Sequence, residues 1–141
     1  MKTKMMIAAL SLFAAPAFAA DVNCQAGTTQ VGGVGSTMES AYCATPNRTP
    51  QGEFVVYWDN GQKQAVGQMQ NGQRVGLWTT YNRQGVKVGT VNFKADKWDG
   101  QRVKFHANGQ PATVELWNNG VMVSAQAFNQ SGQPVTGTKI N

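Results

Sequence analysis

The amino-acid sequence predicts an all-β protein: an elongated antiparallel β-meander of about 24-residue double-hairpin repeats, with a disulfide-clipped N-terminal segment. Three observations support this fold class. Glycines recur at intervals of 24 residues, and Asn-Gly pairs that favour tight hairpin turns punctuate the chain. The stretches between them are rich in Val, Thr, Tyr, Phe and Trp, which favour strands. No segment after residue 20 keeps a helical period over three turns, so we expect little helix.

The repeat starts at Gly52 and gives each copy two glycines and an aromatic residue at fixed spacing. The structural glycines are the first residue of each copy and the ninth after it, namely Gly52, Gly61, Gly76, Gly85, Gly100 and Gly109. The fifth residue after the first glycine is aromatic in every copy: Tyr57, Tyr81 and Phe105. A fourth, partial copy contains Phe128 and Gly132 after a one-residue slip.

Each copy is expected to hold two strands and two turns. Asn-Gly pairs at residues 60–61, 71–72, 108–109 and 119–120 predict type I′ hairpins, because both central residues of that turn take positive φ. We therefore predict strands near residues 53–58, 63–70, 74–81, 87–94, 101–106, 111–117, 121–128 and 134–139. Phe54 and Tyr57 are three residues apart, so either a bulge lies between them or both faces of the sheet carry aromatic residues.

Residues 1–20 predict a secretory signal peptide. Two lysines lie among the first four residues, an apolar run covers residues 5–15, and the small-residue stop Ala17-Phe18-Ala19 follows. This order is typical of an export signal, and the run is shorter than the about 20 apolar residues that a membrane anchor needs. We expect cleavage after Ala19 or Ala20 and a periplasmic or secreted mature protein.

Residues 21–50 form the predicted N-terminal leader, and residues 51–141 form the predicted repeat domain. The leader is rich in Gly, Ser, Thr and Asn without a sustained period, so we expect it to pack on or cap the repeats. Cys24 and Cys43 are the only two cysteines, and an isolated pair in an oxidising compartment predicts one disulfide. Closing a loop of this size would stabilise the fold by roughly 3 kcal/mol.

The charge pattern argues against a nucleic-acid partner. Without the two lysines of the predicted signal, 10 basic residues remain against 7 acidic ones, spread along the chain in ones and twos. A nucleic-acid interface would concentrate Lys and Arg in a patch or stripe. No stretch after residue 20 approaches the length of a membrane span. We expect a protein or a cell-envelope component as the partner.

The sequence offers no cofactor site, no metal site and no catalytic constellation. His106 is the single histidine, and one histidine cannot build a typical zinc site without several acidic or cysteine companions. Asp96 and Asp99 flank Trp98 in a predicted turn, but they supply too few oxygen ligands for calcium. The glycine-rich run at 32–35 lacks the Lys-Ser/Thr pair of a phosphate loop. We therefore predict a non-enzymatic protein without a cofactor.

Aromatic side chains are the candidate binding residues. Most of the repeated ones should be core, since full burial of one contributes about 2–3 kcal/mol to a thin sheet. The leader is the only material for a second layer, so we expect part of one face to stay exposed. Trp58 and Trp98 are the first candidates for that face, because the other copies lack an aromatic residue there. The full candidate set is Trp58, Trp98, Tyr57, Trp78, Tyr81 and Trp117.

Residues 52–61 (GEFVVYWDNG) and 76–85 (GLWTTYNRQG) carry a family resemblance. Their pattern, Gly-x-aromatic-x-x-Tyr-x-x-x-Gly, resembles the variant MORN repeat of the YwqK-type antitoxin family. The resemblance covers about residues 52 to 137 and implies an elongated antiparallel sheet of stacked hairpins that serves as an interaction scaffold. Arg102 stands where the third copy should have its aromatic residue, and Ser124 stands where the fourth should have its leading glycine.

We therefore predict a non-enzymatic exported repeat protein that presents a β-sheet surface for protein or envelope binding. Two alternatives stay open. The family resemblance implies a secreted antitoxin or immunity protein that occludes a toxin. A looser resemblance to the choline-binding and glucan-binding repeats of cell-wall proteins implies a glycan-binding module, although the Trp-Tyr-Tyr cluster of those repeats is absent.

Overall fold

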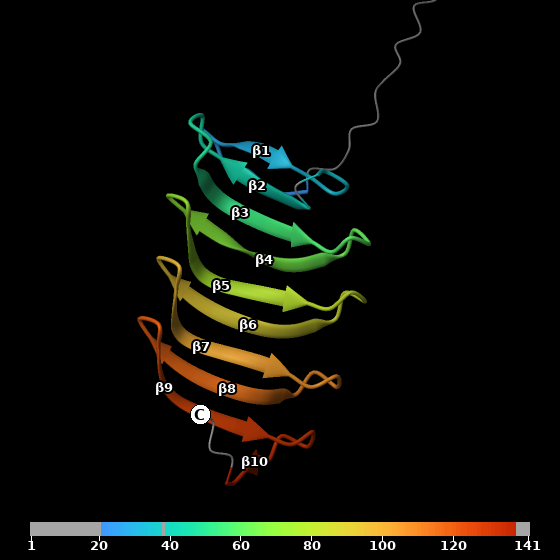
Figure 1. The fold of residues 1–141 in the computed structure, drawn as a ribbon, viewed down its shortest axis with the longest axis vertical. Helices are drawn as coiled ribbons and strands as arrows, with labels where there is room; N and C mark the ends of the chain where they lie inside the picture. Colours follow the sequence, from blue (N-terminus) through green and yellow to red (C-terminus); the bar gives the residue numbers. More distant parts are fainter. Residues whose placement is uncertain (1–20, 38, 138–141) are drawn as a thin grey trace, which may run out of the picture.

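The structure is a computed structural model that describes residues 21–37 and 39–137. These residues form one antiparallel sheet of ten strands, in which each strand pairs with the strands before and after it in the chain (Figure 1). The strands are β1 (Thr29–Gly32), β2 (Ser40–Ala44), β3 (Pro50–Tyr57), β4 (Lys63–Gln70), β5 (Gln73–Tyr81), β6 (Lys87–Lys94), β7 (Lys97–Phe105), β8 (Pro111–Asn118), β9 (Val121–Phe128) and β10 (Pro134–Val135). The predicted all-β meander is confirmed. The predicted signal peptide and its cleavage site lie outside the described residues.

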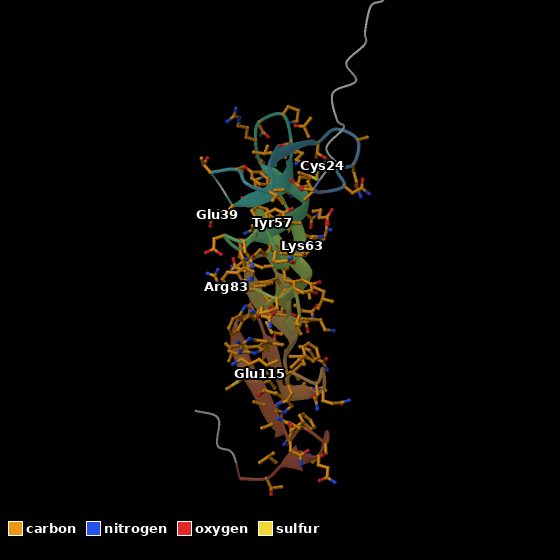
Figure 2. The ribbon with its side chains drawn as sticks, turned by 90° about the vertical axis from the view of Figure 1, so that its right-hand side faces the viewer. Cys24, Glu39, Tyr57, Lys63, Arg83 and Glu115 are labelled. Carbon is orange, nitrogen blue, oxygen red and sulfur yellow. A yellow bond between two sulfur atoms is a disulfide. The ribbon has the colours of Figure 1, made fainter. Side chains whose placement is uncertain are left out.

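The sheet is long and narrow. Figure 1 shows the strands stacked along the long axis from β1 to β10, and Figure 2 shows the same stack edge-on, with Cys24 and Tyr57 toward one end and Glu115 toward the other. Among the described residues, the buried core cluster lies at the β1–β3 end and consists of Val22, Ala41, Cys43, Val55 and Tyr57. Val22 comes from the segment before β1, which covers one face of the sheet there. Farther along, the apolar side chains of Leu77 and Leu116 stay 54% and 43% exposed.

The leader, expected to pack on or cap the repeats, contributes two strands that were not predicted, and these strands extend the sheet itself. β1 pairs with β2, and β2 pairs with β3, so the sheet begins inside residues 21–50. The disulfide between Cys24 and Cys43 is confirmed and ties the chain before β1 to the buried strand β2. Apart from Tyr42, β2 has small side chains, and it is buried on both faces, so it shows no alternation of apolar and polar residues.

The first glycine of each repeat marks a β-bulge. Between successive registered pairs, one residue of β2 lies opposite three residues of β3, and the same mismatch recurs between β4 and β5 and between β6 and β7. Gly52, Gly76 and Gly100 lie in these bulges with φ of 100°, 65° and 97°. In the fourth copy, with Ser124 in place of the glycine, a single residue of β9, Val123, lies between successive registered pairs and has no partner on β8. The smaller bulge accounts for the shorter spacing to Phe128.

The turns on one side of the sheet are two-residue hairpins. Asn71 and Gly72 have φ of 50° and 79°, and Asn119 and Gly120 have 48° and 85°, so type I′ turns are confirmed at these two predicted pairs. The turn between β6 and β7 lacks glycine, and yet Ala95 and Asp96 also take positive φ. Asp96 is held there because its carboxylate accepts hydrogen bonds from the backbone N–H and the guanidinium of Arg74.

The loops on the opposite side of the sheet correct the other two turn predictions. At Asn60-Gly61 and Asn108-Gly109, only the glycine has positive φ. The N–H of Trp58 donates to the carbonyl of Gln62, and the N–H of Gly61 donates back to the carbonyl of Trp58. This pattern is a three-residue loop with one left-handed residue, and a type I′ turn does not form. The second glycine of each repeat is therefore required at the left-handed position.

Both faces of the sheet carry aromatic residues, which answers the question left open at Phe54 and Tyr57. Phe54 stacks on Tyr42 with ring centroids 4.9 Å apart. Tyr57 belongs to the buried cluster with Val22 and Val55 on the other face. Odd sequence separations in a strand reverse the side of the sheet, so the three-residue spacing places the two rings on opposite faces.

Candidate functional site: an aromatic row with a basic groove

One face of the sheet carries a row of six aromatic rings, which we call the aromatic row: Tyr42, Phe54, Trp78, Phe93, Trp98 and Trp117. They come from β2, β3, β5, β6, β7 and β8. In the first half, the centroids of Tyr42 and Phe54 are 4.9 Å apart, and those of Phe54 and Trp78 are 6.1 Å apart. Phe93 meets Trp78 edge-on at 6.1 Å. Such distances allow favourable ring-to-ring contact.

A glycine on the intervening strand lets Trp78 reach Phe54. The indole lies directly over Gly67 of β4, where an added Cβ would be 2.1 Å from a ring carbon of Trp78. The indole Nε1 donates a hydrogen bond of 3.2 Å to the carbonyl of Gln68. Trp78 is consequently only 7% exposed although the described residues form a single sheet without a second layer.

Two further tryptophans extend the row along the sheet. Trp98 lies directly opposite Phe93 in the β6–β7 register. The rings of Trp98 and Trp117 meet edge-on with centroids 4.5 Å apart. Phe93 is 8% exposed, whereas Trp98 and Trp117 are half-buried. Tyr42 and Phe54 are half-buried as well, so the buried rings lie in the middle of the row and the partly exposed rings lie toward its two ends.

Arginines lie over two of the rings, and a carboxylate holds each arginine in place. The guanidinium carbon of Arg74 is 4.2 Å from the Phe93 centroid, and that of Arg102 is 4.7 Å from the Trp98 centroid. Arg74 pairs with Asp96 at 2.8 Å, and Arg102 pairs with Glu115 at 2.8 Å. Both contacts combine cation–π attraction with a charge-assisted hydrogen bond.

Arg102 and Glu115 form a partly buried polar network inside the row. Arg102 Nη1 donates to both carboxylate oxygens of Glu115 at 2.9 and 2.8 Å, and Trp117 Nε1 donates to Oε2 at 2.9 Å. Glu115 is only 6% exposed. Burial would raise the pKa of this carboxyl, but the hydrogen bonds from Arg102 and Trp117 and the charges of Arg102 and Lys104 lower it by more. Glu115 is therefore ionised at neutral pH.

Glu115→Gln is expected to lower the free energy of unfolding at pH 7 by about 1.5 kcal/mol, because charge-assisted hydrogen bonds are lost. A carboxyl whose pKa is lowered by folding stabilises the protein above its unfolded-state pKa. The contribution disappears as the pH falls through the folded-state pKa, which lies below the ordinary 4.5. Urea titrations between pH 7 and pH 2.5 should show the two proteins converging in acid. In an Arg102→Met background the pH-dependent difference should shrink, and a difference that stays constant with pH would contradict this account.

A groove of about 550 Å³ opens beside the row over β5, β6 and β7. Its aromatic lining is Trp78, Phe93 and Trp98. Gly89 of β6 also lines the groove. A side chain at this position would fill the space between Thr80 of β5 and the backbone of Val103 of β7, so the glycine deepens the groove. The groove is lined by three basic residues, Arg74, Arg102 and Lys104, and by no acidic residue. Lys104 is exposed and makes no ion pair among the described residues.

The candidate binding residues thus fall into two groups. Trp78, Trp98 and Trp117 belong to the aromatic row. Trp58 lies outside it, in the loop after β3, where its Nε1 donates to the carbonyl of Tyr81 at 3.1 Å and Arg83 lies over its ring. Tyr57 is 5% exposed in the buried cluster of the other face.

Tyr81 lies at the end of β5 and lines a separate hollow of about 500 Å³ with Tyr57 and Lys63. Burial raises the pKa of the Tyr57 phenol, and the carboxylates of Asp21 and Glu53 raise it further. An ionised phenol is therefore disfavoured at this place. The six candidates consequently do not form one site.

Sequence reasoning missed how Tyr42, Phe54 and the arginines contribute to the row. The signal for Arg102 was present, because it replaces the aromatic residue of the third repeat. In the structure, Trp98 supplies the aromatic ring of β7 in the row, and the guanidinium of Arg102 lies over the ring of Trp98. Tyr42 gave no such signal, because it precedes the repeats and belongs to a strand that was not predicted.

His106 and the acidic side chains of the described residues do not gather at one place. The described residues contain no group of three or more His, Cys, Asp and Glu side chains that could hold a metal ion. The ring of His106 is engaged with the carbonyl of Phe128 at 2.9 Å, so it ties one hairpin loop to the next strand. No helix in the described part of the chain is long and apolar enough to span a membrane. Neither protein-family models nor curated proteins show a match to this chain.

Proposed function

We propose that this protein is a non-enzymatic exported binding module, and that the groove beside the aromatic row is where it docks its partner. The observation that carries the proposal is the composition of this groove, which combines three aromatic side chains with three basic residues and no acidic one. Trp98 is the half-exposed ring of the three, whereas Trp78 and Phe93 are buried beneath the groove. A half-exposed aromatic ring supplies contact area at low entropic cost, and such rings are common anchors of binding sites. The proposal keeps the MORN-like repeat in the role that the resemblance implies, as a scaffold for interaction.

The net charge of the groove indicates which partners it would favour. Arg74 and Arg102 are neutralised by Asp96 and Glu115, whereas Lys104 contributes a net positive charge at the groove. The preferred partner is a segment with flat apolar groups and carboxylates, such as an acidic peptide or an acidic glycan of the cell envelope. The disulfide is the observation that favours export, because such bonds persist in oxidising compartments.

The first experiment is a quantitative pull-down with residues 21–141 against purified peptidoglycan, outer-membrane vesicles and the secreted protein fraction. Trp98→Ala is expected to weaken saturable binding by about tenfold or more, as truncation of a central aromatic anchor does. Lys104→Glu should weaken it as well, and this exposed side chain carries little risk of misfolding. Trp58→Ala is the matched control, since it removes a tryptophan whose ring lies in a hairpin loop outside the groove.

Three outcomes discriminate between the functions. Binding to peptidoglycan that depends on Trp98 would identify a glycan-binding module, and capture of one secreted protein would favour an immunity function. Normal binding by Trp98→Ala and Lys104→Glu, with loss in Trp58→Ala, would move the site to the loop edge and overturn the groove as the docking place.

A further inference from the structure

Strand β9 exposes an open backbone edge at the far end of the sheet (Figure 1). Only Ala127 and Phe128 of β9 pair with β10, which ends at Val135 and is followed by a turn at residues 136–137. Residues 121–126 therefore have β8 on one side and no paired strand on the other among the described residues. An edge of this length presents a row of N–H and C=O groups that another strand can pair with.

The side chains of β9 do nothing to block such pairing. β9 has the sequence VMVSAQAF and contains no charged residue, whereas each of the other strands of eight or nine residues contains at least one: Glu53, Lys63, Arg74, Lys87, Lys97 and Glu115. Val121 and Val123 are 68% and 59% exposed, more than any other large apolar side chain of the described chain. Soluble proteins commonly protect edge strands with charges, prolines or short length.

The other end of the sheet is protected in just this way. β1 is only four residues long, and Gly32 and Gly33 at its end have φ of 74° and 159°. Short length and irregular backbone discourage strand addition there. The open edge is thus found at the β9 end and not at the β1 end. A head-to-tail contact, in which β9 of one copy pairs with β1 of the next, is therefore disfavoured.

We propose that β9 pairs antiparallel with β9 of a second copy of this chain, so that two sheets join into one. Self-pairing sets each side chain near side chains of the same strand, and β9 has no charge that would repel its copy. The pairing is isologous and closes as a dimer with twofold symmetry. The twofold axis of an antiparallel strand pair is perpendicular to the sheet, so the aromatic rows of both copies lie on the same face of the joined sheet.

The dimer would carry two grooves on one surface, which raises the avidity for a repetitive partner without a new contact. Met122, which lies opposite Trp117 in the β8–β9 register, connects the aromatic row to the junction. The inference stands on the β9 edge alone and does not depend on the groove being a binding site.

Sedimentation of residues 21–141 over a concentration series tests the proposal. We expect a monomer–dimer equilibrium, and we expect Val123→Lys to weaken the dimer by about tenfold or more because like charges would meet across the junction. Leu77→Lys is the matched control, since Leu77 is 54% exposed but lies on the interior strand β5. It should dimerise as the wild type does. Circular dichroism should show the same sheet in all three proteins.

Four results would overturn the proposal. The first is a wild type that stays monomeric at the highest concentration that remains soluble. The second is a wild type that stays monomeric while a variant truncated after Gly137 dimerises. This result would show that residues 138–141 of the same chain occupy the β9 edge. The third is an equal effect of Leu77→Lys and Val123→Lys, which would place the contact on a face of the sheet. The fourth is growth beyond a dimer, which would indicate a head-to-tail contact.

Discussion

Trp78→Ala is expected to lower the free energy of unfolding by about 3–5 kcal/mol, as removal of a buried large aromatic side chain generally does. Trp78 is 7% exposed and contacts Phe54 on one side and Phe93 on the other. Its loss would divide the aromatic row and leave the indole's hydrogen-bond partner, the carbonyl of Gln68, without a donor. Equilibrium unfolding in urea, followed by circular dichroism, measures the loss.

Trp58→Ala is the control for this prediction. Trp58 is also a tryptophan with a hydrogen-bonded Nε1, but its ring lies in a hairpin loop. Its removal should cost clearly less than removal of Trp78. A loss under about 1 kcal/mol for Trp78→Ala would contradict the core role of that ring, because surface substitutions usually cost within that range.

Gly67 allows the contact to be tested from the opposite side. Gly67→Ala in the wild type should be destabilising, since the new Cβ would lie 2.1 Å from a ring carbon of Trp78. In the Trp78→Ala background the same change should be nearly neutral, because the clashing ring is gone. A double-mutant cycle over the two positions isolates this coupling. Equal effects in both backgrounds would show that the cost at Gly67 comes from the strand backbone and not from Trp78.

Much of the fold could be predicted because each repeated glycine has a local backbone role. Gly52, Gly76 and Gly100 take positive φ in bulges, and the second glycine of each copy takes positive φ in a loop. The Asn-Gly pairs were ambiguous, since Asn71-Gly72 forms a type I′ turn and Asn60-Gly61 does not. The turn type depends on how many residues separate the last paired residues of the two strands. This number depends on the register of the whole sheet.

The candidate site was harder to predict because the bulges control which side chains share a face. In the β6–β7 register, Val91 lies opposite Arg102 and Phe93 lies opposite Trp98, so one residue of β6 between these pairs matches three residues of β7. Only this register places Trp98 beside Phe93. The sequence shows that Trp98 is unusual among the repeats, but Trp58 is equally unusual and lies in a loop. Pairing geometry, not composition, separates the two.

Reduction of the disulfide, or the double variant Cys24→Ala/Cys43→Ala, is expected to lower the free energy of unfolding by roughly 3 kcal/mol. The bond closes a loop between residues 19 apart. It fixes the segment before β1, so that Val22 of this segment packs in the buried cluster with Val55 and Tyr57. Without the bond, residues 21–24 should leave this face and expose the cluster. The loss should be local, because each strand contacts mainly its neighbours, as in other repeat arrays.

Amide hydrogen exchange distinguishes a local from a global effect. In the reduced protein, amides of β1 and β2 should exchange faster, whereas those of β5 to β8 should keep their protection. The hydrogen bond from the N–H of Tyr57 to the carbonyl of Glu39 is a sensitive reporter, because it joins the end of β3 to the turn before β2. Loss of protection over the whole sheet would show that the N-terminal cluster nucleates every strand. Protection confined to β5–β8 would show instead that the repeats hold the sheet and that the disulfide secures its first end.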